Sequence, residues 1–204
     1  LLKPYFEEET GQAFVAGIKV LVEVSVEFHE LYGYSLTVLN IDPTYTLGDM
    51  ARRRREILKQ LDEEGVLTLN KELELPLLTQ RIAVISSATA AGYGDFCNQL
   101  EHNPYGFVFY PRLFPAVMQG DRVEETIIAA LDTINARRDD WDVVVIIRGG
   151  GATSDLSGFD TYDLAANCAQ FPLPVITGIG HERDDTVLDS VSHTRVKTPT
   201  AAAE

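Results

Sequence analysis

The 204-residue sequence has few cysteines and a shortage of positive charge. Its two cysteines, Cys97 and Cys168, are far apart and form no C-x-x-C pair, which favours free thiols over a disulfide. Lysine and arginine total 17 against 31 aspartates and glutamates, for a formal net charge of −14. Because bulk phosphate binding needs clustered cations, this balance excludes a protein that holds nucleic acid by overall positive charge. Any polyanion site must be local.

Long apolar runs are also missing. No stretch approaches the roughly 20 apolar residues that cross a bilayer, and the opening "LLKP" lacks the charged and apolar regions of a signal peptide. Hydrophobic side chains nevertheless make up 45% of the chain, enough to bury a core. We therefore expect an ordered, soluble, cytoplasmic protein with no membrane association.

Residues 13–42 alternate between apolar and polar side chains. The runs "KVLVEVSVEF" and "YGYSLTVLNI" predict two strands of an antiparallel hairpin. Two strands do not make a stable domain, so the segment is interpreted as the C-terminal part of a small β-barrel. Residues 43–80 form a linker whose helix, in "LGDMARRRREILKQLDEEG", is expected to stop at Gly65. The four arginines at 52–55 are interpreted as a solvated helix face.

From residue 81 the pattern changes to short Val- and Ile-rich runs separated by helical segments. The sequence predicts strands at 81–87, 107–111, 142–147 and 174–180, and helices at 94–101, 122–137 and 161–170. Thr198 is expected to cap a last helix that begins at Pro199. This order predicts an α/β fold, an open, mostly parallel sheet with helices on both faces, over residues 81–204. Ligands of such sheets bind beyond the carboxyl ends of the strands.

One candidate site follows the strand at 142–147, where the chain reads "RGGG". Glycines let successive backbone N–H groups converge on a phosphate, and an arginine adds a fixed fork of donors. The alternative is a tight turn with a surface arginine. No G-K-[ST] follows, and "GIG" lacks the third glycine of a dinucleotide fingerprint, so nucleoside triphosphates and NAD are disfavoured. The residues of this candidate are Arg148, Gly149, Gly150 and Gly151.

A second candidate is "GIGHERDD", which follows the strand at 174–180. If a helix begins there, His181, Asp184 and Asp185 share one face and suit acid–base chemistry or metal binding. The alternative is a hydrogen-bonded structural histidine. The motif is not H-E-x-x-H, because no second histidine stands at 185.

The first strand-to-helix loop, "SSATAAGYGD", offers hydroxyls and one carboxylate. Ser86, Ser87 and Thr89 supply the hydroxyls, and Asp95 is expected to open the next helix, where a carboxylate usually caps backbone N–H groups. Together the three loops suit phosphodiester chemistry better than hydride or acyl transfer. Without further information, a nucleotide- or sugar-phosphate-binding enzyme would also fit.

Five blocks, in order and spacing, resemble the large-subunit family of exodeoxyribonuclease VII. They are "RIAVISSATAAGYGD", "YPRLFPAVMQGD", "DVVVIIRGGGATSDLSGFD", "PVITGIGHERDDTVLDSVS" and "TPTAAAE". The resemblance implies the end of an OB-fold at 1–42, a linker at 43–80 and a catalytic core at 81–204. It implies an exonuclease that degrades single-stranded DNA to oligonucleotides with 5′-phosphates, together with a small helical subunit.

By motif, the resemblance implies functional residues at Asp95, Arg148, His181 and Asp184. The glycines after Arg148, together with Ser86 and Ser87, would line the phosphate site. The first loop departs from the family pattern, since Ala88 replaces the usual proline and Gly94 directly precedes Asp95.

Three further expectations follow from the resemblance. No tightly bound metal or other cofactor is expected, although a Mg²⁺ dependence is left open. Phe28, Tyr32 and Tyr34 are candidates for stacking on DNA bases, the alternative being ordinary sheet surface and core. The isolated 204 residues are expected to be inactive or weak, and a non-catalytic DNA-binding or assembly fragment is the alternative to an enzyme.

Overall fold

The computed structural model describes residues 2–149, 156–180 and 185–204. These fall into two compact units, one reaching from the first helix to Arg55 and the other from Glu56 to the C-terminus, and each is described by itself.

The first unit contains the predicted hairpin. Strands β1 (Leu21–His29) and β2 (Gly33–Asp42) pair antiparallel, with Phe28 opposite Tyr34 and an irregularity between Glu23 and Val24. The turn residue Gly33 has a φ of 74°, which a glycine adopts without strain. Helix α1 (Leu2–Thr10), which the sequence did not predict, buries Phe6 against the ring of Phe14 at a centroid distance of 5.2 Å. The antiparallel hairpin is therefore confirmed.

Helix α2 (Pro43–Glu63) is the predicted linker helix. It ends two residues before Gly65, whose φ of 71° is the left-handed conformation that stops helices. Its last turns belong to the second unit, where Leu61 is fully buried.

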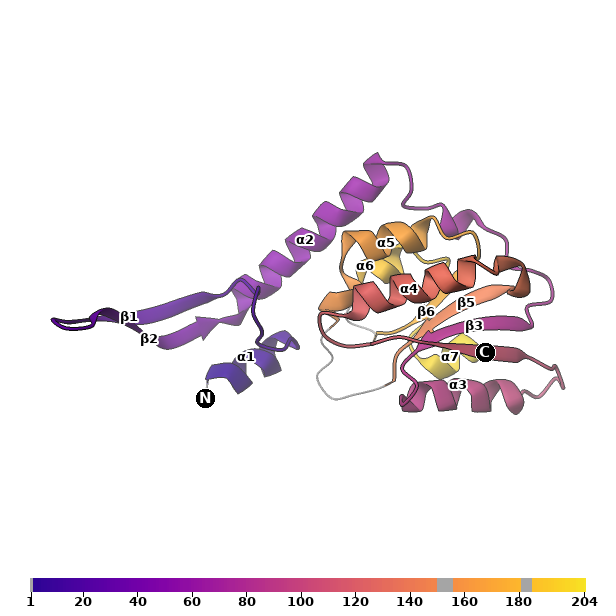
Figure 1. The fold of residues 1–204 in the computed structure, drawn as a ribbon, viewed down its shortest axis with the longest axis horizontal. Coiled ribbons are helices and arrows are strands. Elements are labelled where there is room, and N and C mark those ends of the chain that lie inside the picture. Colours follow the sequence, from indigo (N-terminus) through magenta and orange to yellow (C-terminus); the bar gives the residue numbers. More distant parts are fainter. Residues whose placement is uncertain (1, 150–155, 181–184) are drawn as a thin grey trace. The chain divides into compact units, whose positions relative to one another are not determined.

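The second unit is built on a parallel sheet of five strands within the described residues, in the order β4-β3-β5-β6-β7 (Figure 1). Every pairing between its neighbours is parallel. Their bounds are β3 (Arg81–Ser86), β4 (Tyr110–Pro115), β5 (Val143–Ile147), β6 (Val175–Gly178) and β7 (Thr194–Arg195). The predicted α/β fold is confirmed.

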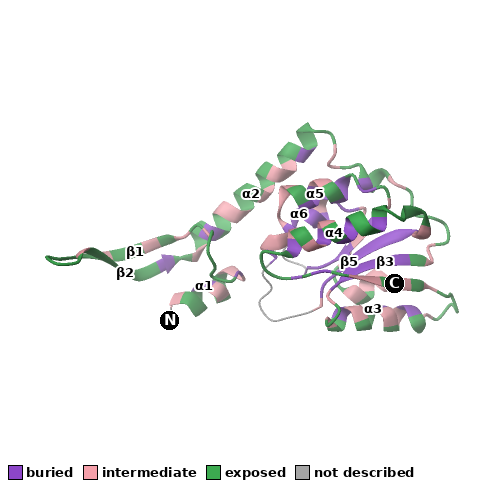
Figure 2. Cartoon of the chain, viewed as in Figure 1, coloured by how far each residue is buried: buried purple, intermediate pink, exposed green. Residues whose placement is uncertain are grey.

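Helices cover both faces of this sheet. Figure 1 shows α3 and α7 on one face and α4, α5 and α6 on the other. Ala83 and Ile85 of β3 pack toward α4 and α5, whereas Ile82 and Val84 pack toward α3 and α7. β3 and β5 are consequently buried between two helical layers, as Figure 2 shows. The helices are α3 (Ala91–Glu101), α4 (Val123–Asn135), α5 (Tyr162–Ala169), α6 (Val187–Val191) and α7 (Pro199–Ala203), with 3₁₀ turns η1 (Asn70–Glu72), η2 (Arg138–Asp140) and η3 (Ser157–Phe159).

Two sequence predictions about this unit were wrong, and one strand was missed. The second strand starts at Tyr110 rather than at 107, because the Asn103 side chain holds the preceding chain in a turn by bonding the Phe107 backbone N–H and carbonyl. Helix α3 starts at Ala91, three residues before the predicted start at Gly94. Strand β7 was missed because its two residues carry no periodic pattern.

A buried thiol provides a test of this core. Cys168 lies fully buried in α5, and burial raises the pKa of its thiol to about 12, whereas Cys97 in α3 is partly exposed. Only thiolates react with maleimides, so Cys97 should be labelled in the folded protein at neutral pH and Cys168 only after unfolding. The variant C97S isolates the second thiol. Equal labelling rates for folded and unfolded C97S would contradict the packing.

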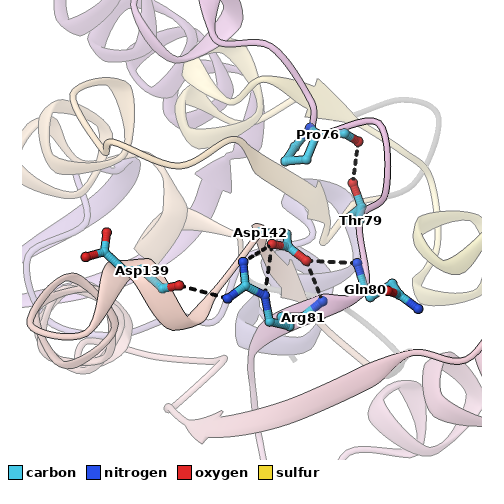
Figure 3. A network of polar contacts seen from close by, with 6 residues as sticks. All are labelled: Pro76, Thr79, Gln80, Arg81, Asp139 and Asp142. Carbon is cyan, nitrogen blue, oxygen red and sulfur yellow. Dashed lines mark hydrogen bonds and ion pairs between the residues drawn. The ribbon is translucent and has the colours of Figure 1, made fainter.

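At the amino-terminal edge of the sheet, a charged network joins β3 to the start of β5 (Figure 3). One Asp142 carboxylate oxygen accepts the backbone N–H groups of Gln80 and Arg81 at 2.9 and 2.8 Å, and the other accepts the Arg81 guanidinium. The Arg81 guanidinium also donates to the Asp139 carbonyl at 2.8 Å. Burial raises the pKa of the Asp142 carboxyl, but the hydrogen bonds from Arg81 and Gln80 outweigh it and hold the pKa below its usual value.

We expect Asp142→Asn to be less stable than the wild type at neutral pH. A carboxyl with a lowered folded-state pKa stabilises the fold above its unfolded pKa, about 3.9, and this contribution disappears as the pH falls through the folded value. Urea unfolding at several pH values should therefore show a difference that is constant near neutrality and shrinks below about pH 4. Asp139→Asn, at a 98% exposed side chain, is the matched control. A difference that grew on acidification would contradict the network.

Candidate functional site

The carboxyl ends of β3, β5 and β6 lie side by side, because these strands are parallel neighbours in the sheet. Arg148 follows β5 directly and is only 6% exposed. Its backbone N–H donates to the carbonyl of Gly178, the last residue of β6, over 3.2 Å. This bond joins the start of the "RGGG" loop to the start of the "GIGHERDD" loop.

The "RGGG" loop also meets the first strand-to-helix loop. A Cβ on Gly149 would lie 3.2 Å from the Ala90 Cβ and from the Gly92 backbone nitrogen. Nine in ten Cβ contacts are longer than this, so a side chain at position 149 would force the start of α3 to shift by a few tenths of an ångström, and a glycine lets the loop pass closely. The three loops that the sequence predicts at one edge therefore do meet there.

The "RGGG" loop and the "GIGHERDD" loop are joined by a second hydrogen bond farther along the chain. The Val187 backbone N–H, at the first position of α6, donates to the Asp160 carboxylate over 2.8 Å. Asp160 follows η3, just beyond the "RGGG" loop. The two loops are thus joined both where they leave the sheet and where they return to helices.

A buried carboxylate in α6 supports the "GIGHERDD" loop. Asp189, 5% exposed, accepts the Thr177 hydroxyl at 2.7 Å, and its second oxygen accepts the Thr186 hydroxyl at 2.8 Å. Thr186 in turn accepts the Asp189 backbone N–H, which completes a capping box. Because Thr177 precedes the loop and Thr186 follows it, Asp189 fixes both ends. Sequence reasoning missed this residue, although the spacing of Thr186 and Asp189 is a capping-box signal.

Asp95 does not occupy the predicted cap position. Helix α3 begins at Ala91 and its N-cap is Ala90, so Asp95 is the fifth helical residue and is exposed on the second turn. The interpretation of Asp95 as a helix cap was therefore wrong. Its carboxylate lies one helical turn beyond Gly92, the residue that packs on Gly149.

The predicted hydroxyl donors differ in their environments. Ser86 is fully buried, and its hydroxyl donates to the Ile147 carbonyl over 2.8 Å, which ties β3 to β5. Ser87 is half-buried and its hydroxyl lies 3.2 Å from that of Thr89. The Ser86 hydroxyl therefore stabilises the pairing of two strands, and Ser87 is the serine at the loop surface.

Asp185, predicted to share a helix face with His181, precedes α6 rather than lying within it. Thr186 has extended backbone angles and caps α6, which starts at Val187. The Asp185 carboxylate forms an ion pair with Arg195 of β7. This carboxylate is therefore held toward the edge strand.

Four predicted site residues, Gly150, Gly151, His181 and Asp184, lie outside the described residues. Among the residues that are described, no group of three or more His, Cys, Asp or Glu side chains could hold a metal ion. Within the same residues, no helix is long and apolar enough to cross a membrane.

The predicted base-stacking residues lie on the hairpin of the first unit. Phe28 and Tyr34 face each other across the strands with ring centroids 5.2 Å apart, and the next pair on that face is Val26 with Leu36. Tyr32 lies in the turn, is 85% exposed and packs against His29. The rings of Phe28 and Tyr34 therefore continue an apolar face of the hairpin, whereas Tyr32 lies in the turn at the end of the hairpin.

Comparison with known proteins assigns the family. Residues 66–204 match the description "Exonuclease VII, large subunit". The chain is 38% identical over 196 residues to the exodeoxyribonuclease 7 large subunit of Deinococcus radiodurans, covering 95% of this chain and 47% of that one. It is 36% identical over 190 residues to the same subunit of Lactobacillus johnsonii (92% and 41%) and 35% identical over 199 residues to that of Nostoc sp. (95% and 46%). The chain spans less than half the length of these relatives, and it belongs to the exonuclease VII large-subunit family.

Proposed function

We propose that residues 81–204 are the catalytic core of a cytoplasmic exonuclease that hydrolyses single-stranded DNA to oligonucleotides with 5′-phosphates. The observation that carries the proposal is the junction of three loops at one sheet edge. Arg148 bonds Gly178, and Gly149 packs on Gly92, so an arginine, backbone N–H groups and the "GIGHERDD" loop share one locality. Membership of the family agrees with this chemistry.

In the proposed reaction, water attacks the phosphorus and the bond from phosphorus to the 3′ oxygen breaks. Arg148 and the N–H groups of Gly149, Gly150 and Gly151 hold the non-bridging oxygens, on which charge develops in the transition state. His181 transfers a proton, either from the water or to the leaving 3′ oxygen. Asp95 and Asp184 orient His181 or the water. Ser87 assists at the loop surface, whereas Ser86 is left out because its hydroxyl donates within the sheet.

The proposal includes a small-subunit partner and an N-terminal DNA-binding region. Because the chain spans less than half of its relatives, the 204 residues alone are expected to show weak cleavage or none. Tyr32, whose side chain is 85% exposed at the turn, is the aromatic residue on the hairpin best placed to stack on a base, followed by Tyr34 at 78% and Phe28 at 65%. No metal is assigned to the described part of the site.

Replacement of His181 tests the proposal. In a full-length chain assembled with its small subunit, His181→Ala should lower the release of acid-soluble nucleotides from single-stranded DNA by about 100- to 10,000-fold, the usual contribution of a general acid or base. Activity should be measured as a function of pH. The variant's pH–rate profile should lack the acidic or basic limb that titration of His181 produces in the wild type.

His102→Ala is the matched control, since His102 is an exposed histidine at the end of α3 whose ring lies 3.0 Å from the Asn98 carbonyl. It should cleave like the wild type. Near wild-type cleavage by His181→Ala would overturn the proposed role of the "GIGHERDD" loop.

A further inference from the structure

The segment that enters α7 fills a gap left by glycines at the carboxyl edge of the sheet. A Cβ on Gly92 would lie 2.8 Å from Pro199 Cγ, and a Cβ on Gly178 would lie 3.0 Å from the Thr198 carbonyl oxygen. Gly92 and Gly149 also touch, since the same Cβ on Gly92 would lie 2.9 Å from Gly149 Cα. Gly92 and Gly178 therefore pack directly on Pro199 and Thr198, and Gly149 joins this cluster through its contact with Gly92.

Backbone contacts along β6 and β7 fix the positions of Thr198 and Pro199. Arg195 of β7 pairs with Thr177 of β6, and the Val196 backbone N–H donates to the Thr177 carbonyl over 2.8 Å. The chain thus follows β6 to its end, where Thr198 meets Gly178. Thr198 then caps α7 by accepting the Ala201 backbone N–H at 3.1 Å, which sets the direction in which Pro199 projects.

Helix α7 is held on its other side by the sheet core. Ala202 and Ala203 pack against the cluster that contains Phe96 and Leu100 of α3. Pro199 has a fixed φ and no rotatable side chain, so it acts as a rigid spacer between α3 and the segment after β6. Pro199, which lies 107 residues after Gly92 and 50 residues after Gly149, therefore limits how far the start of α3 can move away from Gly149.

We infer that Thr198 and Pro199 are positioning residues for Arg148. They hold the start of α3 against Gly149 and so fix the backbone from which the Arg148 guanidinium projects. The inference rests on the function proposed above, in which Arg148 binds the scissile phosphate. It adds a second requirement, that the spacing of the first two loops depends on the entry into α7.

A matched pair of glycines in one helix tests the inference. Gly92 and Gly94 both lie in α3, but a Cβ on Gly94 meets nothing within 4 Å. Alanine at either position should favour the helix equally, which corresponds to a Tm rise of about 2 to 4 °C in the absence of a clash. Any difference between Gly92→Ala and Gly94→Ala therefore reports the contact with Gly149 and Pro199.

The experiment measures kcat, KM and Tm with single-stranded DNA in the full-length chain assembled with its small subunit. Gly94→Ala should keep the wild-type kcat. Gly92→Ala should lower kcat on the order of 100-fold, the effect of a displacement near 1 Å at a reacting centre, while KM changes little. Adding Pro199→Ala to Gly92→Ala removes the Cγ contact and should restore part of kcat.

The outcomes separate the two proposals. If Gly92→Ala cleaves like Gly94→Ala, or loses kcat only in step with Tm and without rescue by Pro199→Ala, the positioning role is wrong. If the wild-type assembly itself releases no nucleotides, the proposed function is wrong and the inference falls with it.

Discussion

Arg148→Ala is expected to lower kcat for single-stranded DNA by about 100- to 1,000-fold, the range found when one donor to a developing oxyanion is removed. Arg148 is 6% exposed, and its backbone is held by Gly178, so its guanidinium should lose little freedom when it binds a phosphate. A buried site also strengthens each charged contact relative to water. Because negative charge develops on the non-bridging oxygens as the bond breaks, both factors should stabilise the transition state more than the bound substrate.

Arg148→Lys separates charge from geometry. Lysine keeps the positive charge but lacks the planar fork that bonds two phosphate oxygens, so most of the loss should remain. Lysine also leaves a smaller cavity than alanine, so a loss of kcat in Arg148→Lys is less readily explained by misfolding. KM should change much less than kcat in both variants, because the interaction is proposed to strengthen as the bond breaks.

Arg137→Ala is the matched control for loss of an arginine. Arg137 is 70% exposed and pairs with Asp140 just before β5, at the opposite edge of the sheet. It should leave kcat unchanged. Folding of each variant can be checked by the protection of Cys168 from maleimide. Wild-type kcat in a folded Arg148→Ala protein would contradict the assignment of this edge to catalysis.

Asn70→Ala is expected to destabilise the second unit by about 3 to 5 kcal/mol, the largest effect on stability that we predict. Asn70 is fully buried, and its amide donates to the carbonyls of Phe171 and Leu173 at 3.0 and 2.9 Å. Its oxygen accepts the backbone N–H groups of Val175 and His193 at 2.9 and 3.0 Å. Alanine would leave these four backbone groups without their partner.

The loss of stability should affect β6 most, because Asn70 accepts the backbone N–H of Val175, the first residue of that strand. Urea unfolding followed by circular dichroism measures the change. Asn167→Ala is the control, since Asn167 is exposed on α5 and makes one hydrogen bond to the preceding turn; surface changes of this kind stay within about 0.5 kcal/mol. A loss below about 1 kcal/mol for Asn70→Ala would contradict the role of Asn70 as a buried junction.

The sequence predicted the central strands of the parallel sheet well because these strands are both buried and short. β3 and β5 are runs of five or more apolar or small residues, which stand out against the polar helices around them. β4 was predicted to end at Pro111, whereas the strand continues to Pro115, because a proline is tolerated on an edge strand. The edge position is a tertiary property that local patterns do not contain.

The candidate site was predictable in part for a similar reason. Strand ends locate Arg148 and the "GIGHERDD" loop, and parallel topology brings them to one edge. The burial of Ser86, by contrast, depends on a bond to Ile147 in another strand, 61 residues away. The packing of Gly92 on Pro199 depends likewise on contacts between distant segments, so the glycine pattern alone suggested a phosphate cradle and gave no sign of the α7 segment.

The most direct measurement is a structure of the full-length assembly with a short phosphorothioate single strand that resists cleavage. We predict that a non-bridging phosphate oxygen, or its sulfur substitute, lies within hydrogen-bonding distance of the Arg148 guanidinium and the Gly149 N–H. A strand bound instead in the hollow of 510 Å³ at the opposite edge, lined by residues including Arg81, Arg138 and Trp141, with Arg148 contacting only protein, would contradict it.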